Sequence, residues 1–410
     1  MTAGDGPATG RRWSPPDRLG MVEFIALMAM LFAVIAFSTD AMLPALPRIA
    51  DELTPDAPNR AQLIVTVFLA GLGVGMLVAG PLSDAVGRKP VVVGGAALFI
   101  AAALLAWRAP TLETLLAARL LMGIGASGPR TVVLAIVRDL YAGRQMARIM
   151  AFVITVFTLV PAAAPLVGQG IIDLAGWRAI FLAFVIFIGI GTLWLTLRQA
   201  ETLPPGARIP FRPARLARSA AEVVGHPKVR STVLVQIMAY VCLFATITSI
   251  QPIFDLTYGR AETFPAWFAA IALASAGGSI LNSRVVVRLG MRRVAGTTFL
   301  VQAIFAGALA ALGLSGVWPD GPPFAVHVLW TVGVFAMAAL TLGNLNALAM
   351  EPMGHVAGMA SSLIGAVSTV AGALLATPLG LAFDGTPVPL TTGVALAATA
   401  ALLLLRRVPD

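Results

Sequence analysis

Charged residues are scarce in this 410-residue chain. Asp, Glu, Lys and Arg make up 11% of it, whereas 58% is hydrophobic and the mean hydropathy is +0.89. Soluble domains typically carry about 25% charged residues. With so little charge the chain lacks the polar surface that folding in water requires, so we expect a lipid bilayer to be its solvent.

Cysteine and histidine are also nearly absent. The single cysteine, Cys242, lies in an apolar run, which excludes intrachain disulfides and cysteine metal sites. The three histidines are far apart, so a metal cluster is not expected, and no nucleophile–base constellation indicates an enzyme. The net charge of +9 comes from basic residues that lie between apolar runs rather than in one patch, so nucleic acid is not an expected partner.

Long apolar runs are what the sequence has in abundance. A membrane-spanning helix needs about 20 apolar residues. The runs predict an all-α membrane protein with twelve spanning helices. Their expected ranges are 21–43, 60–82, 90–107, 112–137, 148–171, 178–197, 230–252, 264–288, 292–314, 324–349, 356–382 and 388–405.

The basic residues predict the orientation of these helices. Most of the 28 lysines and arginines fall in alternate connections, and cytoplasmic connections are the ones enriched in Lys and Arg. We therefore expect a multi-pass membrane protein with both termini in the cytoplasm. The expected parts are a cytoplasmic tail (1–20), a six-helix bundle (21–198), a cytoplasmic linker (199–229), a second six-helix bundle (230–405) and a short tail (406–410).

A short glycine-and-basic motif occurs in both halves of the sequence. Val86-Gly-Arg-Lys89 follows the second expected helix, and Leu289-Gly-Met-Arg-Arg293 follows the eighth. A duplicated six-helix unit is the internal symmetry of transporters that work by alternating access. We expect two pseudo-symmetric bundles.

The connection after the second helix carries a motif, Gly80-Pro-Leu-Ser-Asp84-Ala-Val-Gly87-Arg88-Lys89-Pro. It resembles the signature loop of the major facilitator superfamily, G-x-L-[SA]-D-x-x-G-R-[RK], at every defined position. The glycine permits a tight turn, and Asp84 and Arg88 could form a charge-assisted contact that closes the cytoplasmic face. The alternative is an ordinary charged turn.

A buried charge pair is expected near the outer side. Arg119 lies in the fourth helix, in Arg-Leu-Leu-Met-Gly-Ile-Gly, and Asp40 ends the first helix at a similar depth. A charge within the membrane normally faces the bundle interior and has a partner. We predict that Asp40 and Arg119 pair and couple transport to protons. The alternatives are an arginine that reaches the outer interface and a solvated aspartate.

Two further features lie in the fourth and fifth helices. Arg130 follows a proline in the inner half of the fourth helix, where it could bind an anionic group or pair with Glu23 or Asp139. The fifth helix contains Pro161-Ala-Ala-Ala-Pro165-Leu-Val-Gly168-Gln169, which resembles the antiporter motif of drug exporters, although Ala164 and Gln169 replace two glycines. Packing alone is the alternative explanation of this helix.

Several segments together resemble the Bcr/CflA group of bacterial drug:proton antiporters. They are Phe-Ser-Thr-Asp40, Leu-Pro-Ala-Leu-Pro47, Ala-Ile-Val-Arg138-Asp139-Leu-Tyr141, Ala164-Pro-Leu and Ala-Met350-Glu-Pro-Met-Gly354. The resemblance implies efflux of small amphipathic drugs such as phenicols and bicyclomycin across the bacterial inner membrane, driven by the proton gradient with no other cofactor. Phe32 stands where some broad-range exporters carry a second acid.

Mid-depth polar and aromatic residues are candidates for the substrate cavity. They are Phe32, Arg130, Gln236, Tyr240, Phe244, Asn344 and Asn346. Hydrogen bonding between helices is an equal alternative for each. The sequence thus predicts a monomeric proton-coupled drug antiporter whose partners are the drug, protons and lipid. A proton-coupled symporter that imports a small metabolite remains the alternative, because one fold serves both.

Overall fold

The computed structural model describes residues 19–211 and 213–409, and this part of the chain is almost entirely helical. Twelve of its helices are long and apolar enough to span a membrane. In chain order the elements are α1 (Met21–Asp40), η1 (Leu43–Ala45), α2 (Leu46–Leu53), η2 (Pro58–Gln62), α3 (Leu63–Val86), α4 (Arg88–Trp107), α5 (Leu112–Leu140), α6 (Gly143–Ala175), α7 (Ala179–Arg198), η3 (Pro205–Ala207), α8 (Pro213–Gly225), α9 (Pro227–Pro252), η4 (Ile253–Thr257), α10 (Phe264–Leu289), α11 (Met291–Leu314), α12 (Phe324–Met350), η5 (Glu351–Val356), α13 (Ala357–Leu381) and α14 (Val388–Arg406).

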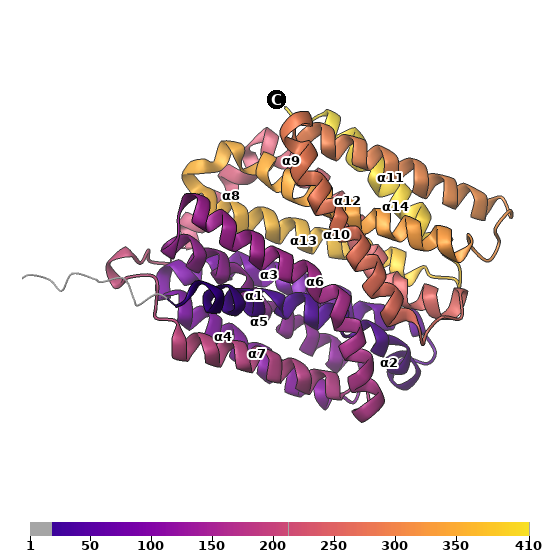
Figure 1. The fold of residues 1–410 in the computed structure, drawn as a ribbon, viewed down its shortest axis with the longest axis horizontal. Coiled ribbons are helices and arrows are strands. Elements are labelled where there is room, and N and C mark those ends of the chain that lie inside the picture. The colour runs from indigo at the N-terminus through magenta and orange to yellow at the C-terminus, as the bar shows by residue number, and fades with distance from the viewer. Residues whose placement is uncertain (1–18, 212, 410) are drawn as a thin grey trace, which may run out of the picture.

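The helices form two bundles, as the repeated motif predicts. Helices α1 and α3–α7 lie together in one bundle and α9–α14 in the other, and the linker between them contains the short helix α8 (Figure 1). All twelve expected spans are present. The second bundle begins at Pro227 rather than at 230, because proline is favoured in the first turn of a helix, where its missing N–H leaves no carbonyl unpaired. Most of the expected N-terminal tail lies outside the described residues.

Glycines allow the helices of the first bundle to pack closely. A Cβ at Gly123 of α5 would collide with the backbone of α3 at Phe68 and Leu72, and one at Gly71 of α3 would collide with the backbone of Leu120. Between helices in lipid, close van der Waals packing replaces the hydrophobic effect as the main attraction. These glycines therefore set the distance between α3 and α5.

The bundles meet along α3 and α13, which lie side by side (Figure 1). Gly73 of α3 faces Val370, and Gly365 of α13 faces Met76. The second contact between bundles is formed by α6 and α10. These four helices form most of the seam, and α9 with α3 and η2 with α13 add smaller contacts between the bundles.

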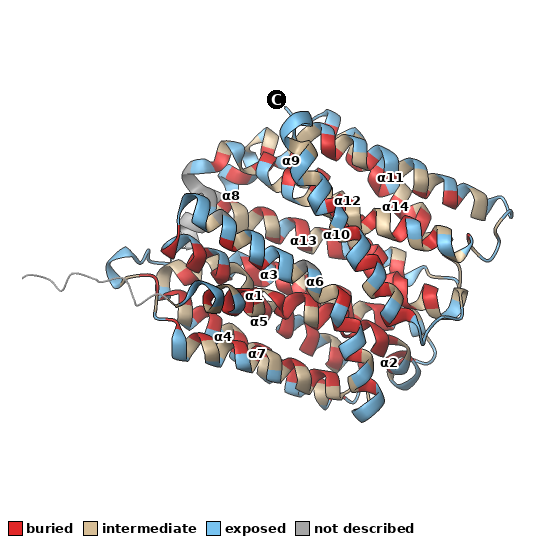
Figure 2. Ribbon diagram, in the orientation of Figure 1, coloured by how far each residue is buried: buried red, intermediate tan, exposed pale blue. Residues whose placement is uncertain are grey.

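Large apolar side chains cover the outside. Figure 2 shows buried residues on the facing sides of the helices and exposed residues on the outer sides, and Leu174 and Val287 are 89% and 87% exposed. Lipid tails are as apolar as these side chains, so their exposure carries no hydrophobic cost in a membrane. We call the end of the molecule that holds the turns at Gly87 and Gly290 the basic end, after Arg88, Lys89, Arg292 and Arg293.

Candidate functional site

Arg119 is the largest polar group in the core. It lies on α5, is fully buried, and donates from Nε to the carbonyl of Ile64 (3.2 Å) and from Nη2 to the carbonyl of Ser38 (3.1 Å). Its guanidinium also lies over the ring of Phe68, 4.3 Å from the centroid. Nη1 has no hydrogen-bond partner within the described residues. The side chain therefore joins α5 to both α1 and α3.

Asp40 lies in the same last turn of α1 that Arg119 contacts. It is 5% exposed, and within the part of the chain that the structure describes its carboxylate has no hydrogen bond or ion pair. The predicted direct Asp40–Arg119 ion pair is therefore wrong for this conformation. Because α1 ends at Asp40, the carbonyl of Ser38 is one of the four that no later helical N–H can reach, and it accepts the guanidinium instead.

Helix α6 packs against the turn that follows Asp40. A Cβ at Gly168 would collide with the backbone of Ala41, so only glycine permits this approach. Pro161 and Pro165 lie within the same helix. Gln169 points away from the site and donates to Asp173 (2.8 Å). The residues of this α6 motif therefore have different roles. Gly168 contacts the turn after Asp40, whereas Gln169 hydrogen-bonds to the exposed Asp173.

The signature loop at the basic end holds an arginine between two acids. Arg88 contacts Asp84 through Nη1 (2.5 Å), Asp139 through Nε (2.9 Å), and the hydroxyl of Ser83 (2.8 Å). The contact expected between Asp84 and Arg88 is therefore present. No sequence motif marks Asp139 as a member of this network, although its position beside Arg138 at the end of α5 places it at the same end of the molecule as Arg88.

A linker acid completes the loop. Gly87 has φ 113°, and the next helix begins at Arg88. The backbone N–H groups of Arg88 and Lys89 donate to the two carboxylate oxygens of Glu201, each at 3.0 Å. Lys89 also donates from Nζ to the carbonyl of Thr196 (3.0 Å). A carboxylate at a helix N-terminus satisfies free N–H groups and complements the helix dipole, so Glu201 fixes the linker to α4.

Arg130 lines a cavity between the bundles at the basic end. The cavity has a volume of about 340 Å³ and lies among α3, α5 and α13, with Arg138, Ser361 and Ser362 also in its wall. The suggested pairing of Arg130 with Glu23 or Asp139 is wrong here. Glu23 binds Arg198 (2.9 Å) and Asp139 binds Arg88, and Arg130 has no ion pair among the described residues.

Four other residues predicted to line the substrate cavity lie in separate environments. Gln236 is buried with no hydrogen bond to Oε1 among the described residues, and the rings of Tyr240 and Phe244 stack at 5.0 Å. The ring of Phe32 lies edge-on to that of Phe157. None of these four lines the cavity at Arg130.

The two asparagine candidates behave differently. Asn344 of α12 donates to Asn282 of α10 (2.8 Å) and to the carbonyl of Leu340 (2.8 Å), so it joins two helices of one bundle rather than facing the seam. Asn346 is half-buried. Side-chain amides that bridge neighbouring helices are common in membranes, and this explains why polarity alone did not separate Asn344 from a cavity residue.

At the end opposite the basic end, the two bundles are joined by residues that no sequence motif marks. Asn59 of η2 donates to the carbonyls of Leu381 (3.1 Å) and Phe383 (2.7 Å). Leu381 is the last residue of α13, and Phe383 lies in the segment that follows it. Beside it, Gln62 is buried against Gly380. No local pattern marks Asn59, because its partners are backbone atoms more than 300 residues away in the chain.

The described residues contain no group of three His, Cys, Asp or Glu side chains that could hold a metal. The site therefore contains one isolated buried acid, one buried guanidinium, a cavity between the bundles at the basic end and a polar contact between the bundles at the opposite end. Buried charges inside a membrane bundle and a cavity between two bundles are features typical of membrane transporters.

Comparison with known proteins agrees with this geometry. The profile of the Major Facilitator Superfamily matches residues 28–376. The MFS-type transporter YdgK of Bacillus subtilis is 28% identical over 387 residues, covering 91% of each chain. The bicyclomycin resistance protein homolog of Haemophilus influenzae is 28% identical over 358 residues, covering 86% of this chain and 88% of its own.

More local and more distant matches extend the comparison. The multidrug resistance protein MdtL of Escherichia coli is 35% identical over 189 residues, covering 46% of this chain and 47% of its own. The solved structure of a D-xylose–proton symporter aligns with a TM-score of 0.75 at 14% identity, over 95% of this chain and 98% of its own, which shows the shared fold alone. The match over most of the chain, the twelve spans and the two bundles lead to one conclusion: the chain belongs to the Major Facilitator Superfamily and is a multi-pass membrane transporter of small molecules, not an enzyme.

Proposed function

We propose that this chain exports small amphipathic drugs across the bacterial inner membrane in exchange for protons, by alternating access of the two bundles. The observation that carries the proposal is the isolated carboxylate of Asp40, which is 5% exposed and lies in the turn of α1 held by Arg119. A buried acid without a counter-charge can carry a proton as a neutral group and release it when its surroundings change.

The turn that follows Asp40 is connected to the seam through α6. Gly168 of α6 packs on the turn after Asp40, and α6 forms part of the seam with α10. A rocking of the bundles would therefore alter the solvation of the carboxylate. Arg119 stays bonded to carbonyls while the acid is neutral and can become its counter-ion once the proton leaves. This exchange of partners would link the proton to the conformational change.

The relatives support drugs as the cargo. Resistance to bicyclomycin and to multiple drugs is part of the names of the Haemophilus and Escherichia proteins, and a chloramphenicol resistance protein of Pseudomonas aeruginosa is 33% identical over 177 residues. These names and the quoted motifs favour the Bcr/CflA group. Within the seam, Arg130 and its cavity of about 340 Å³ would receive the polar end of the cargo, and Phe32, Gln236, Tyr240 and Phe244 would contact it deeper in the membrane.

Orientation and domain limits follow the same proposal. The basic end would face the cytoplasm, with both termini on that side, as expected for the side richest in Lys and Arg. The bundles would be the domains 21–198 and 230–405, joined by the linker 199–229. The contact of Arg88 with Asp84 and Asp139 would hold the cytoplasmic face together in one conformer and open in the other.

Drug resistance in cells tests the direction of transport. The chain is expressed in a bacterial strain without its own efflux pumps, and susceptibility to bicyclomycin, chloramphenicol and a sulfonamide is measured with and without a protonophore. An exporter lowers accumulation of at least one compound, and the protonophore abolishes the effect. Unchanged susceptibility to the whole panel, or raised accumulation, would contradict drug efflux and favour the importing symporter.

Proteoliposomes test the coupling site. Asp40→Asn is expected to reduce drug accumulation driven by an imposed pH gradient to the level of protein-free vesicles, because the amide cannot carry the proton. Asp51→Asn is the matched control: this acid is exposed on α2 near the same end, and its removal should leave transport unchanged. Normal uphill transport by the Asp40 variant would eliminate this residue as the coupling site.

A further inference from the structure

The cavity that contains Arg130 has more positive than negative charge in its wall. Its charged lining residues are Arg88 of α4, Arg130 and Arg138 of α5, and Asp84 of α3. Arg88 contacts both Asp84 and Asp139. Neither Arg130 nor Arg138 has an ion pair or a side-chain hydrogen bond within the described residues. With Asp139 counted, three arginines therefore face two acids, which leaves one positive charge for an anion.

Hydroxyl groups complete the polar part of the wall. Thr131 lines the cavity, and its Oγ1 is buried with no hydrogen bond among the described residues. Ser361 and Ser362 line it from α13 of the second bundle, and a Cβ at Gly80 of α3 would lie only 2.8 Å from Oγ of Ser362. A buried donor without a partner costs free energy, and an anionic acceptor would satisfy it. The two bundles thus present donors to the same space.

The apolar part of the wall is rich in methionine. Met76 of α3, Met146 of α6, Met350 of α12 and Met359 of α13 all line the cavity, and they are four of the 15 methionines in the chain. Methionine is unbranched and flexible, and it is typical of surfaces that accept ligands of different shapes. The cavity therefore suits apolar bodies of variable shape that carry a negative charge at one end.

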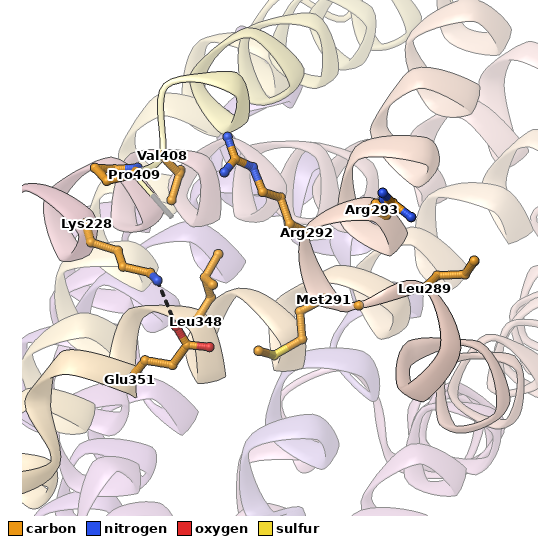
Figure 3. Close-up of a pocket in the computed structure, with 10 residues that line it drawn as sticks. Lys228, Leu289, Met291, Arg292, Arg293, Leu348, Glu351, Val408 and Pro409 are labelled. Atoms are coloured by element: carbon orange, nitrogen blue, oxygen red, sulfur yellow. Dashed lines mark ion pairs between the residues drawn. The ribbon is translucent and has the colours of Figure 1, made fainter.

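A second cavity at the basic end lacks this position between the bundles. Its volume is about 380 Å³, and all of its lining residues belong to the second half of the chain (Figure 3). Figure 3 shows Lys228 and Glu351 paired in its wall (2.8 Å). The cavity at Arg130, by contrast, is lined by helices of both bundles, so a ligand there contacts both halves at once, as a cargo that moves along the seam must.

We propose that the cavity at Arg130 selects amphipathic organic anions, with Arg130 and Arg138 supplying the positive charge and the four methionines holding the apolar body. The inference rests on the proposed function and narrows its cargo to molecules with one ionised acidic group, such as a carboxylate or a deprotonated sulfonamide. Ser361 and Ser362 would donate to the same group from the second bundle, so the anion would bridge the seam.

Binding to the purified full-length protein in phosphatidylcholine nanodiscs tests the class of ligand. The probes are sulfamethoxazole, which is ionised at its sulfonamide nitrogen at mildly alkaline pH, and its derivative methylated at that nitrogen, which cannot ionise. Calorimetric titration is expected to show about tenfold tighter binding of the anion, because hydrogen bonds to a charged group are the stronger ones. Arg130→Gln should remove this preference by weakening the binding of the anion alone, and Arg130→Lys should retain part of it.

Two controls complete the experiment. Arg144→Gln removes an exposed arginine from the start of α6, outside the cavity, and should keep the full preference. Inorganic phosphate at the same concentration should not displace sulfamethoxazole, because it makes no contact with the apolar wall. Equal affinity of the wild type for the two probes, or an unchanged preference in Arg130→Gln, would overturn the proposal. Displacement by phosphate would overturn the amphipathic anion as the occupant.

The titration also separates this inference from the proposed function. It uses no proton gradient and does not depend on the direction of transport. Preference for the anion that is lost in Arg130→Gln, in a protein that exports none of the drugs from cells, would support the anion site and contradict drug efflux. Export from cells without any preference between the two probes would support efflux and overturn the anion site.

Discussion

At the scale of single residues, the site depends on what a helix end leaves unpaired. The sequence predicts a buried arginine and a buried aspartate at similar depth, and both are buried in one place. It does not predict that the guanidinium takes the carbonyl of Ser38 and leaves the carboxylate of Asp40 alone. Every residue has a backbone carbonyl, so the sequence does not show which one lacks an intrahelical N–H partner; the position at which α1 ends decides it.

Substitution of Arg119 tests this arrangement. The planar guanidinium reaches the carbonyls of Ile64 and Ser38 in two directions while stacked on Phe68, and the single ammonium of a lysine cannot do so. Arg119→Lys is expected to slow transport in proteoliposomes by about tenfold, since a hydrogen bond to a charged group contributes about 1.5–3 kcal/mol. Arg60→Lys, in an exposed pair with Glu113, is the matched control and should transport normally. Equal rates for wild type and Arg119→Lys would show that the two directed bonds are dispensable.

At the scale of elements, close helix contacts are set by single glycines. Whether a glycine matters depends on the backbone that faces it, which the sequence does not show. Gly123 faces the backbone of α3 at Phe68 and Leu72, whereas no atom lies within 4 Å of a Cβ added at Gly307 of α11. Two glycines in similar apolar helices therefore have different roles.

A pair of alanine substitutions separates these roles. Gly123→Ala is expected to destabilise the protein by about 1–3 kcal/mol, the usual cost of overpacking, because backbone atoms of α3 cannot rotate away as a side chain can. Gly307→Ala should be neutral or slightly stabilising, since alanine is the better helix former. Thermal unfolding of the detergent-solubilised protein, followed by size-exclusion chromatography, measures both. A similar melting temperature for the two variants would contradict the close contact of α3 and α5.

At the scale of the whole molecule, the seam between bundles determines which side opens. At the basic end Arg88 joins α3, α4 and α5 within the first bundle. At the opposite end the two hydrogen bonds of Asn59 cross from one bundle to the other. Each such bond contributes about 1 kcal/mol. The loss of both would change the ratio of the two conformers by about ten- to thirtyfold.

Cysteine labelling detects this change. In a Cys242→Ser background, a cysteine at Gln62, which is 5% exposed, should react slowly with a membrane-impermeant maleimide. Adding Asn59→Ala should accelerate the labelling several-fold, because it releases α13 from η2. A cysteine at Leu314, already 72% exposed, should label at the same rate with or without Asn59. Unchanged labelling at Gln62 would show that the closure does not depend on Asn59.

The sequence by itself determined the twelve spans, the division into two bundles, the signature loop and the depth of Asp40 and Arg119. These properties follow from local hydropathy and from the spacing of residues along single helices, which a linear pattern records. Only the tertiary structure decided the partners: Ser38 for Arg119, Asp139 for Arg88, Asn282 for Asn344 and two carbonyls for Asn59. In a bilayer every helix is apolar on most of its surface, so hydropathy contains little information about which faces meet, and that is settled by close packing and by polar atoms that need a partner.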